Sequence, residues 1–236
     1  MYIVVIITKF NFMAQLVFLV GKSGMGKSTS LRNLNPEETV IINTDQKALP
    51  FKQFGKKYNE DKRNYRKTSD VAIVLNTLQK VNKLDNVKTV VIDTWSRIMT
   101  DTVMSQKFRA EKGFDKWSKM AANQYDLINF INDSMRDDII VYLMAHPETH
   151  YDDSGFASER IGVQGKMLER FVPESFSTIV LYTEIVKSPG KPNRHVFRTI
   201  SSGSDTCKTP LEMFEEDMVD NDLIDINETI REYYSI

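Results

Sequence analysis

The chain has 236 residues, of which 41% are hydrophobic and 27% are charged, with a formal net charge of −1. This length suits one large domain with a sizeable core, and the composition is that of a soluble globular protein. The near-neutral balance excludes a global attraction to nucleic acid, the single cysteine excludes an internal disulfide, and no apolar run approaches the roughly 20 residues of a membrane span.

Residues 1–14 are predicted to be an N-terminal extension. Residues 2–8 are apolar but follow no basic segment, which does not match a secretory signal peptide. They can form an extra strand. Alternatively, Met13 is the translation start and the residues before it are an over-extension, because Met13 stands only three residues before the next apolar run.

A glycine-rich segment joins an apolar strand at residues 16–20 to a helix start at residues 29–34. It reads GKSGMGKS and matches the phosphate-binding pattern G-x-x-x-x-G-K-[ST] in full. In this setting backbone N–H groups point at phosphates and the helix dipole favours their charge. Lys27 would reach the β- and γ-phosphates, and the Ser28 hydroxyl would ligate Mg²⁺. The predicted phosphate-binding residues are Gly21, Lys22, Ser23, Gly24, Met25, Gly26, Lys27, Ser28 and Thr29.

A second strand at residues 39–43 precedes a basic stretch at residues 47–67, which carries eight Lys or Arg against two acidic residues. Four aromatic residues lie within it: Phe51, Phe54, Tyr58 and Tyr65. Cations interleaved with aromatics suit single-stranded nucleic acid, because phosphates are neutralised and bases stack. A solvated helix with a few core aromatics is the alternative.

Helices and strands alternate through the rest of the chain. Asp70 is a predicted N-cap. The predicted helices are 71–84, 95–104 and 121–136, and the predicted strands are 88–93, 138–145, 176–182 and 195–200. The last two strands form a hairpin turned near residues 189–190, and residues 147–166 are predicted to be a long functional or mobile loop.

This alternation predicts an α/β fold, with a mainly parallel sheet flanked by helices and a C-terminal antiparallel hairpin. Residues 15–209 form the predicted domain. Residues 210–236 form an acidic C-terminal segment with nine acidic residues and one basic residue. A charge run of this kind is most often a solvated helix.

Two carboxylates end predicted strands and are candidates for phosphate chemistry. Asp93 closes an apolar strand, as a residue holding the water shell of Mg²⁺ would; a helix cap is the alternative. Hydrolysis also needs a group that orients water. The residue after Asp93 is Thr94 rather than an acid, so Asp45 is the candidate, with an ordinary turn residue as the alternative.

Taken in chain order, residues 21–28, 40–45, 90–94 and 143–146 resemble the RecA-like class of P-loop ATPases. The resemblance implies a P-loop NTPase fold with a RecA-like core, and ATP with Mg²⁺ as cofactors. It implies that the metal residues are Ser28 and Asp93, and that Lys27, Asp45 and His146 are catalytic. His146 stands where the class places a polar residue that senses the γ-phosphate. The class more often has Glu where this chain has Asp45.

More narrowly, residues 21–34 and 203–214 resemble bacteriophage single-domain nucleotide-binding recombination proteins, a similarity that covers roughly residues 15–216. This implies an ATPase acting in DNA recombination, repair or replication, with single-stranded DNA as a partner and the host cytoplasm as its location. RecA-like ATPases often complete their site with a cation from a neighbouring subunit, so a homo-oligomer is expected. The candidate cations are Lys187, Lys191, Arg194 and Arg198, or these are solvated edge charges.

Two other functions remain open from the sequence. A nucleotide-gated binding module with little hydrolysis fits the short Asp45 and the absence of an acid after Asp93. A small-molecule or nucleotide kinase fits less well, because no convincing basic lid is present.

Overall fold

The computed structural model describes residues 13–236, so the strand predicted within residues 2–8 lies outside the described part of the chain. The strands are β1 (Gln15–Val20), β2 (Thr39–Asn43), β3 (Tyr65–Lys67), β4 (Thr89–Asp93), β5 (Ile140–Ala145), β6 (Pro147–Tyr151), β7 (Ala157–Ile161), β8 (Ile179–Val186), β9 (Arg194–Arg198) and β10 (Met218–Asp220). The helices are α1 (Phe54–Lys57), α2 (Val71–Val81), α3 (Trp95–Met104), α4 (Gln106–Ala110), α5 (Asp115–Ser134), α6 (Lys166–Glu169) and α7 (Leu223–Tyr234). Two further helices are of the 3-10 type, η1 (Ser28–Asn33) and η2 (Pro173–Phe176).

Eight strands form one sheet in the order β10-β9-β8-β1-β5-β4-β2-β3. The strands from β8 to β3 pair in parallel, whereas β9 and β10 are antiparallel additions at one edge. This arrangement confirms the predicted α/β fold with its mainly parallel sheet and closing hairpin. β5 lies between β1 and β4, so one strand separates the glycine-rich loop from the strand that ends at Asp93.

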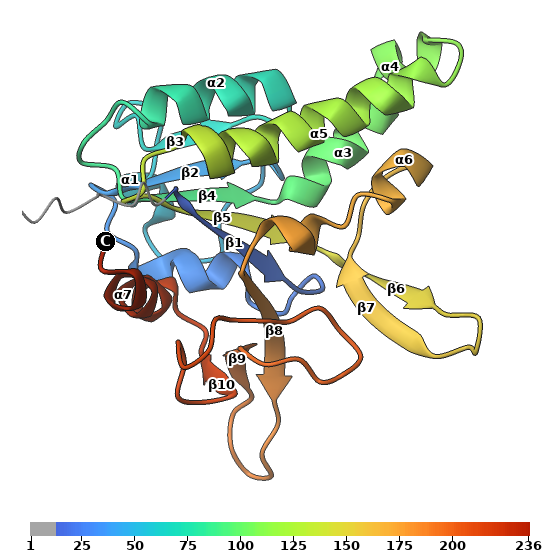
Figure 1. Cartoon of the computed structure of the whole chain (residues 1–236). Coiled ribbons are helices and arrows are strands. Elements are labelled where there is room, and N and C mark those ends of the chain that lie inside the picture. Colours follow the sequence, from blue (N-terminus) through green and yellow to red (C-terminus); the bar gives the residue numbers. More distant parts are fainter. Residues whose placement is uncertain (1–12) are drawn as a thin grey trace, which may run out of the picture.

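Helices cover both faces of this sheet (Figure 1). The helices α2, α3 and α5 pack on one face, and α7 with η1 packs on the other. Side chains alternate between the two cores along each strand: Phe18 of β1 joins the first, and its neighbour Leu19 joins the second. The central strands are therefore buried on both faces, as their nearly continuous apolar sequences require.

Local signals set the start of α2 where the sequence predicts it. The Asp70 carboxylate accepts hydrogen bonds from the backbone N–H groups of Ala72 (2.8 Å) and Ile73 (3.3 Å). The helix then buries Val74 and Leu78, which lie four residues apart on one face. This N-cap prediction is confirmed.

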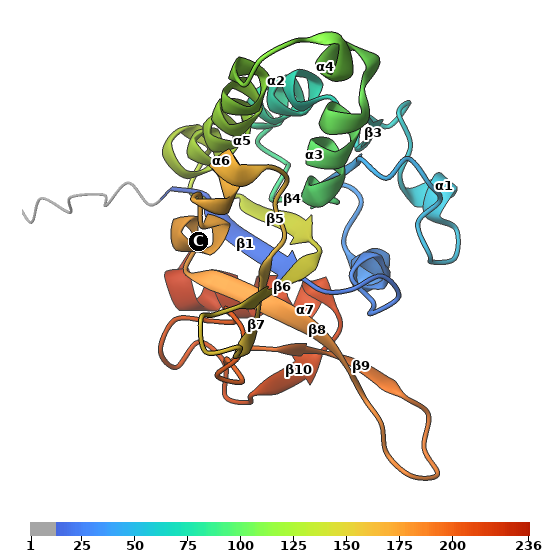
Figure 2. The same ribbon diagram turned by 90° about the vertical axis from the view of Figure 1, so that its right-hand side faces the viewer.

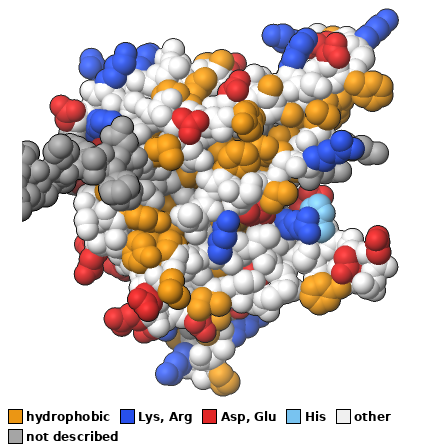
Figure 3. All heavy atoms as spheres, in the orientation of Figure 1, with side chains coloured by type: hydrophobic (Ala, Val, Ile, Leu, Met, Phe, Trp, Pro, Cys, Tyr) orange, Lys and Arg blue, Asp and Glu red, His pale blue; other side chains and the backbone are white. Residues whose placement is uncertain are grey.

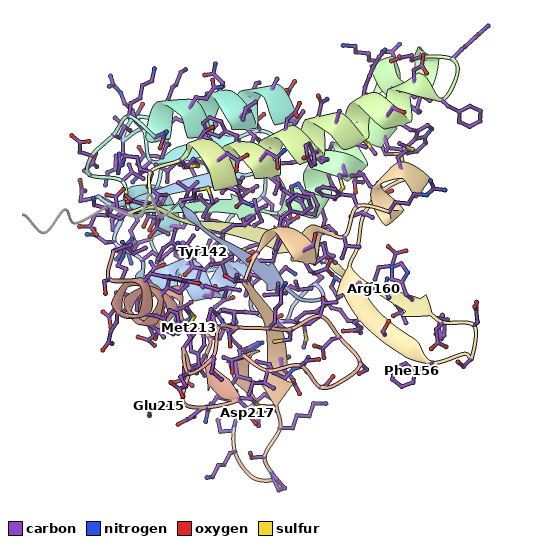
Figure 4. The ribbon with its side chains drawn as sticks, in the orientation of Figure 1. Tyr142, Phe156, Arg160, Met213, Glu215 and Asp217 are labelled. Atoms are coloured by element: carbon purple, nitrogen blue, oxygen red, sulfur yellow. The ribbon has the colours of Figure 1, made fainter. Side chains whose placement is uncertain are left out.

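The prediction of a long loop over residues 147–166 is wrong, because most of this segment is an antiparallel hairpin of β6 and β7. The Asp152 carboxylate closes the turn by accepting from the N–H groups of Ser154 and Phe156, both at 2.9 Å. The hairpin stands out from the body of the protein (Figure 1), and Phe156 near its turn points away from the sheet (Figure 4). Because both faces of the hairpin are largely solvated, its strands lack the apolar alternation that reveals a strand in sequence.

The acidic segment at residues 210–236 packs against the rest of the domain. β10 pairs with β9, and α7 buries Leu223, Ile226 and Ile230 in the second core. The Tyr142 hydroxyl, which lies inside the molecule in Figure 4, donates to Asn227 Oδ1 at 2.8 Å. The acidic residues within α7, Asp225, Glu228 and Glu232, lie on the exposed side of this amphipathic helix.

The basic stretch at residues 47–67 buries its aromatic side chains. Tyr58 and Tyr65 are only 1% and 7% exposed, and Phe51 and Phe54 pack against the same core. The rings of Tyr58 and Tyr65 are therefore not available to stack on bases, and for these two residues the nucleic-acid interpretation is wrong. Core aromatics were the alternative, and they are what the structure contains.

Two surface properties bear on partners. Within residues 13–236, no helix combines the length and the apolar character needed to cross a membrane. Exposed apolar side chains, including Tyr125 and Met167, gather over α5 and α6 in Figure 3.

Candidate functional site

The carboxyl ends of β1, β2, β4 and β5 meet at one edge of the sheet, where open α/β sheets place their ligand sites. The glycine-rich loop follows β1, Asp45 follows β2, Asp93 ends β4 and His146 follows β5. All four contribute to one cavity of about 360 Å³. Its lining is Lys22, Ser23, Gly24, Gly26, Lys27, Ser28, Thr29, Asn43, Asp45, Lys47, Ala48, Leu49, Pro50, Asp93, Thr94 and His146.

Two glycines give the loop its shape by different means. Gly26 has φ of +99°, a conformation that side chains rarely adopt, and a Cβ there would lie 3.0 Å from His195 Nδ1. A Cβ on Gly21 would lie 1.8 Å from Thr183 Oγ1. The loop is therefore packed closely against β8 and β9, which leaves its other side open to the cavity.

Lys27 lies at the centre of the loop with only 6% of its surface exposed. Its ammonium donates to the carbonyl oxygens of Gly21 and Lys22, the latter at 3.2 Å. Burial lowers the pKa of Lys27 to about 8, an effect that the negative charges of Asp93 and Asp45 oppose. The site thus holds a desolvated cation whose charge is available to an anionic ligand.

His146 lies against this cation. Its Nδ1 is 3.4 Å from Lys27 Nζ and 3.2 Å from the Gly21 carbonyl oxygen. Burial lowers the pKa of His146, and the positive charge of Lys27 lowers it further, so the imidazole is neutral near pH 7. The Lys27 ammonium only donates and the Gly21 carbonyl only accepts, so Nδ1 accepts from the first in one tautomer and donates to the second in the other.

Asp93 is 1% exposed, and its Oδ1 has no hydrogen-bond partner among the residues that the structure describes. Burial raises its pKa, while a hydrogen bond from the Ser28 side chain and the charge of Lys27 favour the ionised form. A buried carboxylate oxygen without a partner, beside a hydroxyl, is a donor set that suits a hard cation such as Mg²⁺. Ser28 and Asp93 therefore fit the metal role that the sequence suggests.

Asp45 lies beside Asp93 and contacts two residues that sequence reasoning did not place in the site. Its Oδ2 is 2.7 Å from Lys47 Nζ, and its Oδ1 accepts from the Thr94 hydroxyl at 3.2 Å. Lys47 stands two positions after Asp45, within the basic stretch, and Thr94 directly follows Asp93. Both residues stand close to the end of a predicted strand, and this position was the signal that could have placed them in the site.

Of the candidate cations on the β8–β9 hairpin, Arg198 is not available to a neighbouring subunit. Its guanidinium contacts Asp205 at 2.7 Å and Glu184 at 3.3 Å, with 15% of the side chain exposed. That prediction is wrong, because Arg198 lies on a paired strand between two carboxylates. Lys187 and Lys191 are exposed near the turn, which projects from the body in Figure 2, and no salt bridge between described side chains engages them.

The glycine-rich loop is also tied to the β6–β7 hairpin. Lys22 Nζ lies 2.7 Å from Glu159 Oε1 on β7. The backbone of Glu159 is held in turn by its N–H bond to the Ser204 carbonyl, at 2.8 Å. The loop, the hairpin and the segment after β9 therefore form one connected set of contacts.

Comparison with known proteins places most of the chain in one family model. Residues 13–208 match the model described as an AAA domain. No curated protein sequence matches the chain. Among solved structures, a KaiC-like protein from Pyrococcus horikoshii is 15% identical, with a TM-score of 0.46 over 79% of this chain and 78% of that one. The flagellar accessory protein FlaH from Methanocaldococcus jannaschii is 10% identical, with a TM-score of 0.43 over 87% and 84%.

Proposed function

The chain belongs to the AAA-domain family and has the fold of a RecA-like P-loop ATPase. We propose that it binds ATP with Mg²⁺ and hydrolyses it. One observation carries the proposal. The buried ammonium of Lys27, the unpartnered Asp93 Oδ1 and the Asp45 carboxylate line the same cavity at the carboxyl edge of the sheet. These are the groups that phosphoryl transfer to water requires.

Each residue has a separate part in the proposed reaction. Loop amides and Lys27 bind the β- and γ-phosphates, and the Ser28 hydroxyl with the Asp93 carboxylate holds the cation. When bound, Mg²⁺ neutralises charge on the phosphate oxygens. The Asp45 carboxylate orients the attacking water. The neutral imidazole of His146 donates from Nδ1 to a γ-phosphate oxygen in place of the Gly21 carbonyl, and so senses whether that phosphate is present.

A nucleotide-gated binding module with little turnover is the second candidate, and one observation favours it. Both oxygens of Asp45 are already engaged, by Lys47 and by Thr94. A water would have to share these oxygens with the Lys47 ammonium and the Thr94 hydroxyl, which lowers the capacity of the carboxylate to orient it. A homo-oligomer would assist hydrolysis if Lys187 or Lys191 of a second copy reached the γ-phosphate, where a cation stabilises developing charge.

A role in phage DNA recombination, repair or replication, in the cytoplasm of the host, is a further part of the proposal. It rests on the sequence resemblance over residues 21–34 and 203–214. The exposed cations of residues 47–67, among them Lys52 and Lys56, support contacts with phosphates. Because Tyr58 and Tyr65 are buried and Phe51 and Phe54 pack against the core, any affinity for single-stranded DNA is expected to be mainly electrostatic and to fall steeply with salt.

ATP turnover measured with and without single-stranded DNA tests these functions together. We expect Mg²⁺-dependent phosphate release that rises when single-stranded DNA is added. Tight ATP binding without turnover would contradict hydrolysis and support the binding module. Phosphoryl transfer to an added nucleoside monophosphate would instead support a kinase, and turnover indifferent to DNA at low salt would contradict the DNA role alone.

The lowered pKa of Lys27 predicts a pH dependence of ATP binding. The free protein loses the Lys27 proton above about pH 8, whereas bound phosphates favour the charged form. ATP binding must therefore take up a proton above that pH, and affinity should fall by up to roughly tenfold per pH unit. Isothermal titration calorimetry between about pH 7.5 and 9.5, in two buffers of different ionisation enthalpy, measures both quantities. A flat affinity across this range would contradict the assignment.

A further inference from the structure

A second cavity, of about 320 Å³, adjoins the phosphate site. Thr29 lines both cavities, so they meet at the first turn of η1. The remaining lining of the second cavity is Arg32, Asn193, Arg194, His195, Asp220 and Asn221. Its size falls in the range of roughly 300–1,000 Å³ that is typical of small-molecule sites.

Asn221 is the unusual residue in this lining. It is 4% exposed, and neither Oδ1 nor Nδ2 of its amide has a hydrogen-bond partner among the described residues. The large majority of buried side-chain polar atoms in proteins do have a partner. The amide of this lining residue therefore carries one acceptor and two N–H donors that no described residue satisfies.

The position of this amide is fixed from several sides. Arg32 donates to the backbone carbonyl oxygen of Asn221 at 2.5 Å and pairs with the carboxylate of Asp222 at 3.0 Å. Asp222 in turn caps α7 by accepting from the Ile224 N–H. Against the glycine-rich loop, a Cβ on Gly26 would lie 3.2 Å from Asn221 Oδ1 and 3.3 Å from Nδ2. The amide is thus held directly behind the loop.

A nucleotide whose phosphates occupy the loop would pass Thr29 to reach this second cavity, so its base and ribose are the groups that fit there. On one edge adenine offers its N6 amino group as a donor beside N7 as an acceptor, and an asparagine amide matches both at once. The corresponding edge of guanine offers two acceptors, O6 and N7, which leaves the amide oxygen opposite an acceptor. We propose that Asn221 selects adenine over guanine in the bound nucleotide, an inference that rests on the proposed function.

The test compares binding of ATP, GTP and inorganic tripolyphosphate by calorimetry in the wild type and in Asn221→Leu. Leucine is similar in size but forms no hydrogen bond. We expect the wild type to prefer ATP, and Asn221→Leu to bind ATP about 5–150-fold more weakly, with less than about a twofold change for tripolyphosphate. Asn129→Leu, on α5 at the opposite face of the sheet, is the matched control and should keep the wild-type ratio.

The role of Asn221 and the phosphate site can be contradicted separately. Tripolyphosphate binding with an unchanged ratio of ATP to GTP affinity in Asn221→Leu would overturn the Asn221 assignment and leave the phosphate site intact. Absence of tripolyphosphate and ATP binding to the wild type would overturn both. If Asn221→Leu lowers the melting temperature strongly, Asn221→Ala removes the same hydrogen bonds without adding bulk and should show the same loss of preference.

Discussion

Replacing Lys27 with alanine is expected to weaken ATP binding by at least about 100-fold and to reduce turnover below detection. The ammonium is the buried cation at the centre of the loop. A hydrogen bond to a charged group contributes about 1.5–3 kcal/mol, and Lys27 would make more than one to the phosphates. Because every kind of phosphoryl chemistry considered for this site needs that cation, the effect should appear in both binding and rate.

Calorimetry with ATP and a phosphate-release assay measure the two effects. The Lys27→Ala protein should remain folded, since the change removes a buried charge that costs desolvation energy. Lys83→Ala is the matched control, because Lys83 is exposed beyond the end of α2. Unchanged binding and turnover in Lys27→Ala would rule out the phosphate site and every function proposed from it.

Asp45→Asn is expected to lower ATP turnover by about 10²–10⁴-fold, which is the usual contribution of a positioned acid–base group. Asparagine keeps an acceptor for the Thr94 hydroxyl, so the local backbone should hold. The ion pair with Lys47 is lost, but the Lys47 side chain is 68% exposed, so that pair contributes little to stability. ATP affinity should change by less than about threefold.

Single-turnover kinetics with separate binding measurements distinguish this outcome from a folding defect. Asp101→Asn offers a matched control, because Asp101 pairs with Arg97 on the surface of α3. If Asp45→Asn turned over ATP at the wild-type rate, another group would have to orient the water. A wild type without turnover would instead favour the binding module.

The parallel core was predictable because its strands are unambiguous in sequence. The strands predicted at 39–43 and 88–93 match β2 and β4 within one residue, since each is a short apolar run buried on both faces. Such strands bring their carboxyl ends to one edge, so the grouping of the loop with Asp45, Asp93 and His146 also followed from their order.

The parts that sequence reasoning missed are not marked by the local pattern of apolar, polar and charged residues. The β6–β7 hairpin is solvated on both faces, so no periodicity marked its strands. Asn221 lies in an acidic segment whose charge suggested a solvated helix, and only its position behind Gly26 gives it meaning. Likewise Arg198 looked like a free edge cation until its pairing with Asp205, seven residues away, was known.

The contacts between the glycine-rich loop and the region of β10 and α7 also constrain the order in which the site can form. A ribosome makes the loop early and makes Asn221 and Asp222 much later, yet the backbone next to η1 is held by the bond of Arg32 to Asn221 and its ion pair with Asp222. During synthesis the nascent loop therefore lacks this support until Asn221 and Asp222 have left the exit tunnel. A chain synthesised only as far as the loop therefore cannot yet present the loop with this support in place.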